Sequence, residues 1–231
     1  MQMKTIGLLG GMSWESTELY YRLINEETKR SLGDLNSARI AMVSVNFQEI
    51  EALQHQGDWA AAADILAKNA SQVEAAGADF LLICTNTMHK VAEEVQSAIN
   101  IPLLHIADAT ATRIKESGIK TIGLLGTKFT MEQDFYRGRL EQCGLNVLVP
   151  SEKDREIIHQ VIYDELCLGE AKQRSRDAYL RIIGKLNNDG AEGVIEGCTE
   201  IVLLVQQKHT NVTLFDTTTI HAQEAVIRAL S

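Results

Sequence analysis

The stretch Thr5-Ile-Gly-Leu-Leu-Gly10 occurs twice in the chain, the second time as Thr121-Ile-Gly-Leu-Leu-Gly126, 116 residues further on. The stretch Ala76-Gly-Ala-Asp79 likewise has a counterpart, Asp189-Gly-Ala-Glu192, at an offset of 113 residues. Two marks in the same order at nearly equal offsets indicate a duplicated unit of roughly 110 residues, the size of a small domain. Coincidence is the alternative, because glycine-rich strand ends recur in many α/β proteins.

The pattern of apolar residues predicts an α/β protein. Short, nearly continuous apolar runs alternate with longer amphipathic segments, as expected for parallel strands that are covered on both faces and joined by right-handed crossovers. Asp58 and Gly77 are the expected caps of one helix, and Ser151 the N-cap of another that ends near Gly169. The predicted strands are residues 5–9, 39–45, 79–84, 101–105, 121–125, 145–149, 192–197 and 212–215.

We expect two domains with four parallel strands each. No Gly-, Ser- or Pro-rich stretch near the middle of the chain marks a flexible linker, and the last helix, about residues 218–230, is expected to pack back on the first half. The first domain is therefore predicted to comprise residues 1–103 plus 217–231, and the second residues 104–216.

The composition favours a folded protein that handles small molecules. Of 231 residues, 45% are hydrophobic, and there are only two prolines. Twenty-two Lys and Arg against 31 Asp and Glu give a net charge of −9, which disfavours nucleic-acid partners. No apolar run approaches the ~18 residues of a membrane span, and no signal peptide is apparent. Four cysteines without a C-x-x-C pair fit a reduced, cytoplasmic protein, and no His or Cys cluster predicts a metal site.

The internal repeat brings two polar turns into register. At the offset of 113, Thr85 falls on Cys198, and both follow a predicted strand at the sheet edge where α/β proteins bind ligands. Backbone N–H groups and polar side chains at two such edges, facing each other, would enclose a small anionic molecule. Cys198 is expected to have a favoured thiolate, because it precedes a helix. Cys84 points to the opposite strand face from Thr85, so we expect it to be packed behind the site.

Three motifs in order resemble the cofactor-independent aspartate/glutamate racemase family, closest to its L-aspartate/glutamate-specific subgroup. They are Gly7-Leu-Leu-Gly-Gly-Met12, Asn86-Thr87-Met88-His89 and Gly197-Cys-Thr-Glu200. The resemblance covers essentially the whole chain. It implies two pseudo-symmetric αβα domains, each around a four-stranded parallel sheet, with the active site in the cleft between them.

The resemblance also implies a two-base reaction at Cα without pyridoxal phosphate or another cofactor, in a homodimer. One thiol removes the proton from one face, and a second thiol returns it to the other. Cys198 then stands at the second catalytic cysteine and Thr85 at the first. Residues implied to bind the substrate, a small acidic amino acid such as L-aspartate or L-glutamate, are Met12, Asn86, Thr87, Thr127, Thr199 and Glu200.

The chain departs from the family at Thr85, whose hydroxyl titrates far above a thiol and is no ordinary base at neutral pH. We therefore expect slow chemistry that is biased to one enantiomer, the L form by resemblance to the subgroup. The Arg and Lys with which many aspartate racemases bind the distal carboxylate are also absent, and Cys167 occupies the place of the Lys. Gln48 is a candidate replacement.

Some residues have two open interpretations. His89 either hydrogen-bonds back to the site or ties the helix to a neighbouring strand. His105 and His221 either orient groups around the site or serve in cap and core roles, and the second interpretation is favoured. Glu196 would share a strand face with Cys198, so we expect the strand to twist or end first, leaving Glu196 near solvent or a helix. For the whole protein, the alternatives to a racemase are a one-base decarboxylase or isomerase of the same superfamily, and a non-catalytic dicarboxylate-binding protein.

Overall fold

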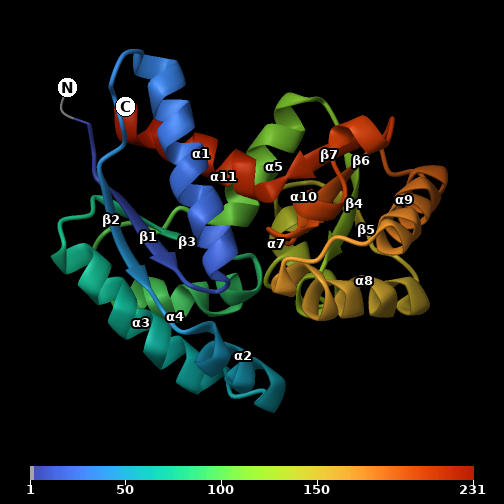
Figure 1. The fold of residues 1–231 in the computed structure, drawn as a ribbon, viewed down its shortest axis with the longest axis horizontal. Helices are drawn as coiled ribbons and strands as arrows, with labels where there is room; N and C mark the ends of the chain where they lie inside the picture. Colours follow the sequence, from blue (N-terminus) through green and yellow to red (C-terminus); the bar gives the residue numbers. More distant parts are fainter. Residues whose placement is uncertain (1–2) are drawn as a thin grey trace. The chain divides into compact units, whose positions relative to one another are not determined.

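The structure, a computed structural model, describes residues 3–231 and divides into two compact units (Figure 1). The first unit runs to Ile106 and includes His221–Ser231. The second unit is Ala107–Ile220. No helix in residues 3–231 is both long and apolar enough to cross a lipid bilayer.

Each unit is built around a parallel sheet. In the first unit the order is β2-β1-β3, and in the second it is β5-β4-β6-β7. The repeated Thr-Ile-Gly-Leu-Leu-Gly stretch forms β1 in one unit and β4 in the other, and each of these strands has a neighbour on both sides. The strands are β1 (Ile6–Gly10), β2 (Ile40–Ser44), β3 (Phe80–Ile83), β4 (Thr121–Gly126), β5 (Asn146–Leu148), β6 (Gly193–Gly197) and β7 (Thr213–Asp216).

Helices and short 3-10 turns connect the strands. In the first unit they are α1 (Trp14–Leu32), α2 (Phe47–Gln56), α3 (Trp59–Ala75), η1 (Thr87–Val91) and α4 (Ala92–Ser97), together with most of α11 (Thr217–Leu230). In the second unit they are α5 (Ile106–Glu116), α6 (Lys128–Glu132), α7 (Arg137–Gln142), α8 (Glu152–Asp164), η2 (Leu166–Leu168), α9 (Gln173–Asn188), α10 (Ile201–Leu204) and η3 (Gln207–His209). The expected N-caps are confirmed, because Asp58 accepts from Ala61 N and Ser151 from Asp154 N.

Strand alternation sorts the side chains of the first unit onto two faces. Ile6, Leu8 and Cys84 pack with α1 and with α11, whose Ala222 and Val226 are buried there. Leu9, Leu81 and Ile83 pack instead with α2, α3, η1 and α4. Figure 1 shows α1 and α11 on one side of this sheet and α3 and α4 on the other. Successive residues of β3 therefore face different helical layers, as the strand pleat requires.

The predicted strand at 101–105 is wrong as a full strand, because it forms only one bridge, Leu81 to Leu103. Leu81 N donates to Pro102 O at 3.0 Å, and Leu104 N donates to Leu81 O at 2.8 Å. Beyond this bridge the ladder stops, since Leu104 O and Ile106 N bond to the imidazoles of His221 and His89 instead. The first sheet has three strands where four were expected, and the second has the expected four.

Candidate functional site

The predicted residues of the first unit gather where β3 ends. Thr85 and Asn86 follow β3 directly, and Thr87 begins η1. All three are buried, with Thr85 at 9% exposure. Cys84, one position earlier, is fully buried in the apolar layer against α1 and α11. Burial without a partner charge raises the pKa of the Cys84 thiol far above its usual range. The expectation that Cys84 is packed in the interior is confirmed.

His89 fixes this turn from within η1. Its Nδ1 lies 2.8 Å from Thr85 O, and Ile106 N donates to its Nε2 at 3.3 Å. The ring is 2% exposed and packs against His105 at a centroid distance of 4.4 Å. The two interpretations of His89 therefore hold together, since one ring bonds back to the turn and also ties it to a neighbouring segment.

Two further residues of the predicted site lie elsewhere in the first unit. Met12 is 3% exposed and packs in the apolar cluster with Leu9 and Ile83. Gln48 is exposed near the start of α2, and its Nε2 donates to Glu51 at 3.4 Å. Roles for both residues in binding substrate stay predictions.

The predicted residues of the second unit gather where β6 ends. Cys198 Sγ donates to Glu200 Oε2 at 2.9 Å, and Thr199 Oγ1 donates to the same oxygen at 2.8 Å. All three side chains are buried, at 3–8% exposure. Thr127 follows β4, the neighbouring strand, and caps α6 by accepting from Thr130 N. One carboxylate oxygen therefore holds both the thiol and the hydroxyl beside it.

The expected thiolate at Cys198 is wrong for the protein without substrate. Burial raises the pKa of this thiol well above its usual range, and the negative charge of Glu200 raises it further. The expected helix dipole is also weak, because α10 has only four residues and Glu200 is its N-cap. Cys198 rests as a protonated thiol that donates its hydrogen to Glu200.

Glu196 also differs from expectation, because β6 continues past it to Gly197 and buries its side chain to 2% exposure. In the ladder it lies directly opposite Asp216 of β7. Burial, with a smaller contribution from Asp216, raises the pKa of Glu196 to about 8. The Glu196 carboxyl is therefore neutral at physiological pH and leaves no full charge on the Cys198 face of the strand.

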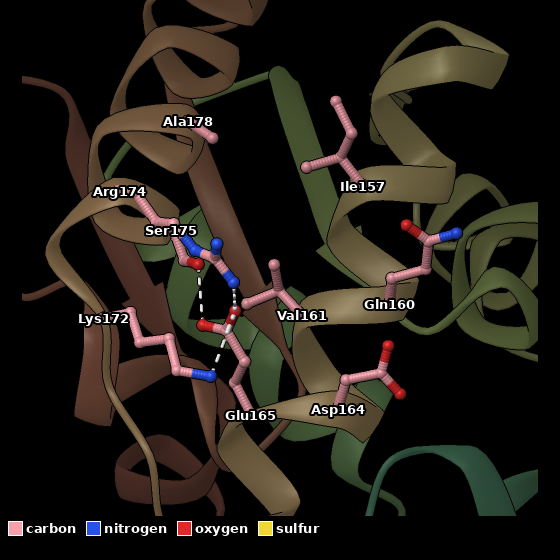
Figure 2. Close-up of a pocket in the computed structure, with 9 residues that line it drawn as sticks. All are labelled: Ile157, Gln160, Val161, Asp164, Glu165, Lys172, Arg174, Ser175 and Ala178. Atoms are coloured by element: carbon pink, nitrogen blue, oxygen red, sulfur yellow. Dashed lines mark hydrogen bonds and ion pairs between the residues drawn. The ribbon is translucent and has the colours of Figure 1, made fainter.

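A surface cavity of about 420 Å³ lies where α8 meets the start of α9 (Figure 2). The buried Glu165 carboxylate accepts from Ser175 Oγ at 2.6 Å and Arg174 Nη2 at 3.2 Å, and Lys172 Nζ lies 3.7 Å away. Figure 2 shows these groups converging on Glu165. These cations serve to neutralise Glu165.

Tyr179 of α9 is a neighbour of Cys198 that the sequence did not reveal. Burial raises its pKa well above the usual range, and the charge of Glu165 adds to this effect. Its hydroxyl donates to Ile158 O at 3.0 Å. A buried aromatic residue on a helix gives the same sequence signal as an ordinary core residue.

All four cysteines are free thiols. Within residues 3–231, no group of three or more His, Cys, Asp or Glu side chains has an arrangement suited to a metal ion. The chemistry that the described residues offer is therefore that of a buried thiol beside a carboxylate in one unit, and of a hydroxyl with an amide side chain at the corresponding turn of the other.

The sequence profile of the Asp/Glu/Hydantoin racemase family matches residues 9–225. The broad specificity amino-acid racemase RacX of Bacillus subtilis (strain 168) is 23% identical over 228 residues, which is 96% of each chain. A candidate Asp/Glu racemase from Yersinia pestis is 55% identical with a TM-score of 0.93, covering 99% of this chain and 100% of that one. An aspartate racemase homologue from Pyrococcus horikoshii OT3 is 36% identical with a TM-score of 0.85 and the same coverage.

The profile match spans nearly the whole chain, and two solved structures above 30% identity share its fold from end to end. The three motifs that suggested a racemase lie at the ends of β1, β3 and β6, at the carboxyl edges of the two sheets. The chain is therefore an isomerase of the Asp/Glu/hydantoin racemase family.

Proposed function

We propose that this protein is a cofactor-independent amino-acid racemase that acts at Cα of aspartate or glutamate, slowly and with a preference for the L substrate. In the proposed reaction, Cys198 serves one face of Cα and Thr85 the other. Asn86, Thr87 and Thr199 would bind the α-carboxylate. The observation that carries the proposal is the buried Cys198 thiol, donating to Glu200 at the end of β6 in a chain of this family.

The resting thiol needs activation before it can act as a base. The Cys198 proton already points at Glu200 Oε2, so Glu200 is the group that accepts it when the thiolate forms. The ammonium group of a bound amino acid brings a positive charge, which favours the thiolate and lowers the pKa of Cys198. Substrate binding itself would then produce the active base. Glu200 would then act as the proton acceptor of the Cys198 thiol, in addition to its expected position near the substrate amine.

The proposed chemical step removes one proton from Cα and returns another to its opposite face, and it involves no change of oxidation state. The thiolate of Cys198 takes the proton of the Cα–H bond, and the electron pair of that bond delocalises onto the α-carboxylate. The Thr85 hydroxyl gives its proton to the opposite face of Cα and becomes an alkoxide. A water molecule reprotonates this alkoxide, and the hydroxide that remains takes the proton from the Cys198 thiol, which returns Cys198 to the thiolate. A hydroxyl is a far stronger acid than an amino-acid Cα–H bond, so this donation is feasible. In the reverse direction the Thr85 alkoxide has to remove the Cα proton, and because this alkoxide is very scarce near neutral pH, inversion is slow in both directions.

The asymmetry should appear in hydrogen exchange. The two enantiomers have equal free energies, so the inversion pathway must have the same kcat/KM in both directions. The enantiomer whose Cα–H faces Cys198 also exchanges this hydrogen with retention, because the thiol can return a solvent proton to the same face. We expect exchange with retention for one enantiomer, the L form, and little for the other.

Incubation in deuterated water with L- or D-aspartate, and with the two glutamates, tests the proposal. Chiral chromatography reports inversion, and mass spectrometry of each separated enantiomer reports exchange. Equal exchange with retention from both enantiomers would contradict the one-sided chemistry. Absence of both inversion and exchange would exclude the racemase.

A one-base decarboxylase of the same superfamily is the second candidate, favoured by the single thiol that remains at the two corresponding turns. Release of carbon dioxide from substituted malonates, in the absence of amino-acid inversion, would identify it. A non-catalytic dicarboxylate-binding protein would instead bind aspartate with unchanged affinity after Cys198→Ser and turn over neither class of compound.

A further inference from the structure

Three buried histidines of the first unit form a cluster around His89, the residue that contacts the Thr85 turn. His89, His105 and His221 are 0–4% exposed. The His89 ring lies 4.4 Å from the His105 ring and 6.0 Å from the His221 ring, measured between centroids. The three residues come from η1, the segment before α5, and α11, so a single cluster joins parts of the chain that are far apart in sequence.

The partners of His89 determine its protonation. Thr85 O can only accept a hydrogen bond, so Nδ1 of His89 carries the proton. Ile106 N can only donate, so Nε2 carries none. Both nitrogens are thus committed, and the ring is neutral in one tautomer.

His221 acts on the same segment from α11. Its Nε2 donates to Leu104 O at 2.9 Å, and the Tyr20 hydroxyl donates to its Nδ1 at 2.7 Å. Burial lowers the pKa of His221 to about 3, so this ring is neutral as well. His89 and His221 together hold Leu104 O and Ile106 N, the backbone groups that follow the last bridge beside β3.

Thr85 is held through its backbone and not through its side chain. Within the described part of the chain, its hydroxyl makes no hydrogen bond to the protein. Its carbonyl is fixed by His89, and that ring is fixed in turn by Ile106 N. The direction of the Thr85 side chain therefore follows from a main-chain position that one imidazole sets.

We propose that His89, supported by His221, is a positioning residue that orients Thr85 for proton donation by fixing the Thr85 carbonyl. This inference rests on the proposed racemase function. Misplacement of a reacting group by about 1 Å can cost roughly 100-fold in rate, so loss of this hydrogen bond should slow the Thr85 step selectively.

Two substitutions separate the nitrogens of His89. In His89→Asn the amide nitrogen lies near the position of Nδ1, so the variant retains a donor to Thr85 O. In His89→Gln the amide oxygen reaches the position of Nε2, so the variant retains only the acceptor for Ile106 N. The matched control is His55→Gln, because His55 is an exposed histidine of α2.

We expect His89→Gln to lose inversion of aspartate at least tenfold. Exchange with retention, which depends on Cys198, should stay within about twofold. We expect His89→Asn to retain most of the inversion. A purely structural role would lower inversion and exchange in proportion in both variants, and that result would overturn the proposal. Equal loss of inversion in His89→Asn and His89→Gln would also overturn it.

A second measurement decides the question even if the protein proves inactive. The γ-methyl signal of Thr85, in methyl-labelled protein and assigned by its loss in Thr85→Ser, reports whether the side chain keeps one rotamer. We expect the signal to shift and its order parameter to fall in His89→Gln, but to be retained in His89→Asn. An unchanged Thr85 methyl in His89→Gln would reject the positioning role. Absence of turnover in the wild type would reject only the racemase.

Discussion

The turns after β3 and β6 occupy corresponding places in the two units, and different chemical groups hold them. Thr85 corresponds to Cys198 at the offset of 113 residues, which also pairs His89 with Val202 and Thr87 with Glu200. In the first unit a histidine fixes the main-chain carbonyl of the turn. In the second unit a glutamate holds the thiol itself. In the first unit the histidine therefore fixes the backbone of Thr85, which carries the hydroxyl. In the second unit the glutamate contacts the Cys198 sulfur, the proposed reacting atom, directly.

The strands beside these turns also differ in the polar groups that end or continue their hydrogen-bonded ladders. Leu81 pairs with Leu103 in one sheet and Val194 with Leu214 in the other, so His105 corresponds to Asp216. The second ladder continues to Glu196 and Asp216, whereas the first stops and is replaced by imidazoles. Burial lowers the pKa of His221 and raises that of Glu196, so both groups are neutral. The strand pairings of the two units correspond, whereas the polar groups beside them differ.

The largest effect should come from Cys198→Ser, which places a hydroxyl at both corresponding turns. A serine hydroxyl does not ionise near neutral pH, so inversion and Cα exchange should fall by about 10²- to 10⁴-fold. Binding of aspartate, measured by calorimetry, should change little.

The matched control is Cys143→Ser, which makes the same substitution at a half-buried free thiol that belongs to neither turn. Full exchange activity in Cys198→Ser would show that the thiol is not needed for the reaction. The chemical difference between the two turns would then have no effect on catalysis.

Thr85→Cys tests the comparison in the opposite direction by placing a thiol at both turns. A second base should increase inversion roughly tenfold or more and allow exchange with retention from both enantiomers. The control Thr85→Val keeps the shape without the hydroxyl, and it should lose inversion while retaining exchange at the Cys198 face. Inversion at the wild-type rate in Thr85→Val would mean that water, not Thr85, supplies the proton.

Glu200→Gln tests the contact that distinguishes the second turn. The carboxylate raises the pKa of Cys198 by its charge and by accepting the thiol hydrogen, so a neutral amide should lower this pKa. Titration of the protein with ¹³C-labelled cysteine, followed by NMR, measures the shift directly, with Cys143 as internal reference. A higher Cys198 pKa in the variant would contradict the contact.

The sequence was sufficient to predict most of the fold because that information is local. Continuous apolar runs marked seven strands, and Asp58 and Ser151 marked helix starts through contacts within three residues. The strand at 101–105 was overpredicted because its ladder is ended by His221, more than a hundred residues away. The state of Cys198 was missed for a similar reason, since its pKa depends on burial and on the direction of the Glu200 side chain, neither of which is encoded in the motif.

The pH dependence of stability should show whether Glu196, the buried acid of the second unit, is neutral in the folded protein, as the buried His221 is in the first unit. An unfolded glutamate titrates near about 4.3, whereas the folded group has a pKa of about 8. The folded state therefore binds more protons between these values, and the free energy of unfolding falls as pH rises through this window. Between about pH 6 and 7 the wild type should lose roughly 1 kcal/mol through this group.

Glu196→Gln keeps the size of the side chain and stays uncharged at every pH, so it should remove this part of the pH dependence while preserving the fold. Urea unfolding at the two pH values measures the difference, and Glu94→Gln, at an exposed position of α4, is the control. If wild type and Glu196→Gln lost stability in parallel, Glu196 would be ionised in the folded protein. A full charge would then lie beside Asp216 on the Cys198 face of β6, and that charge would favour the thiol over the thiolate even after substrate binds.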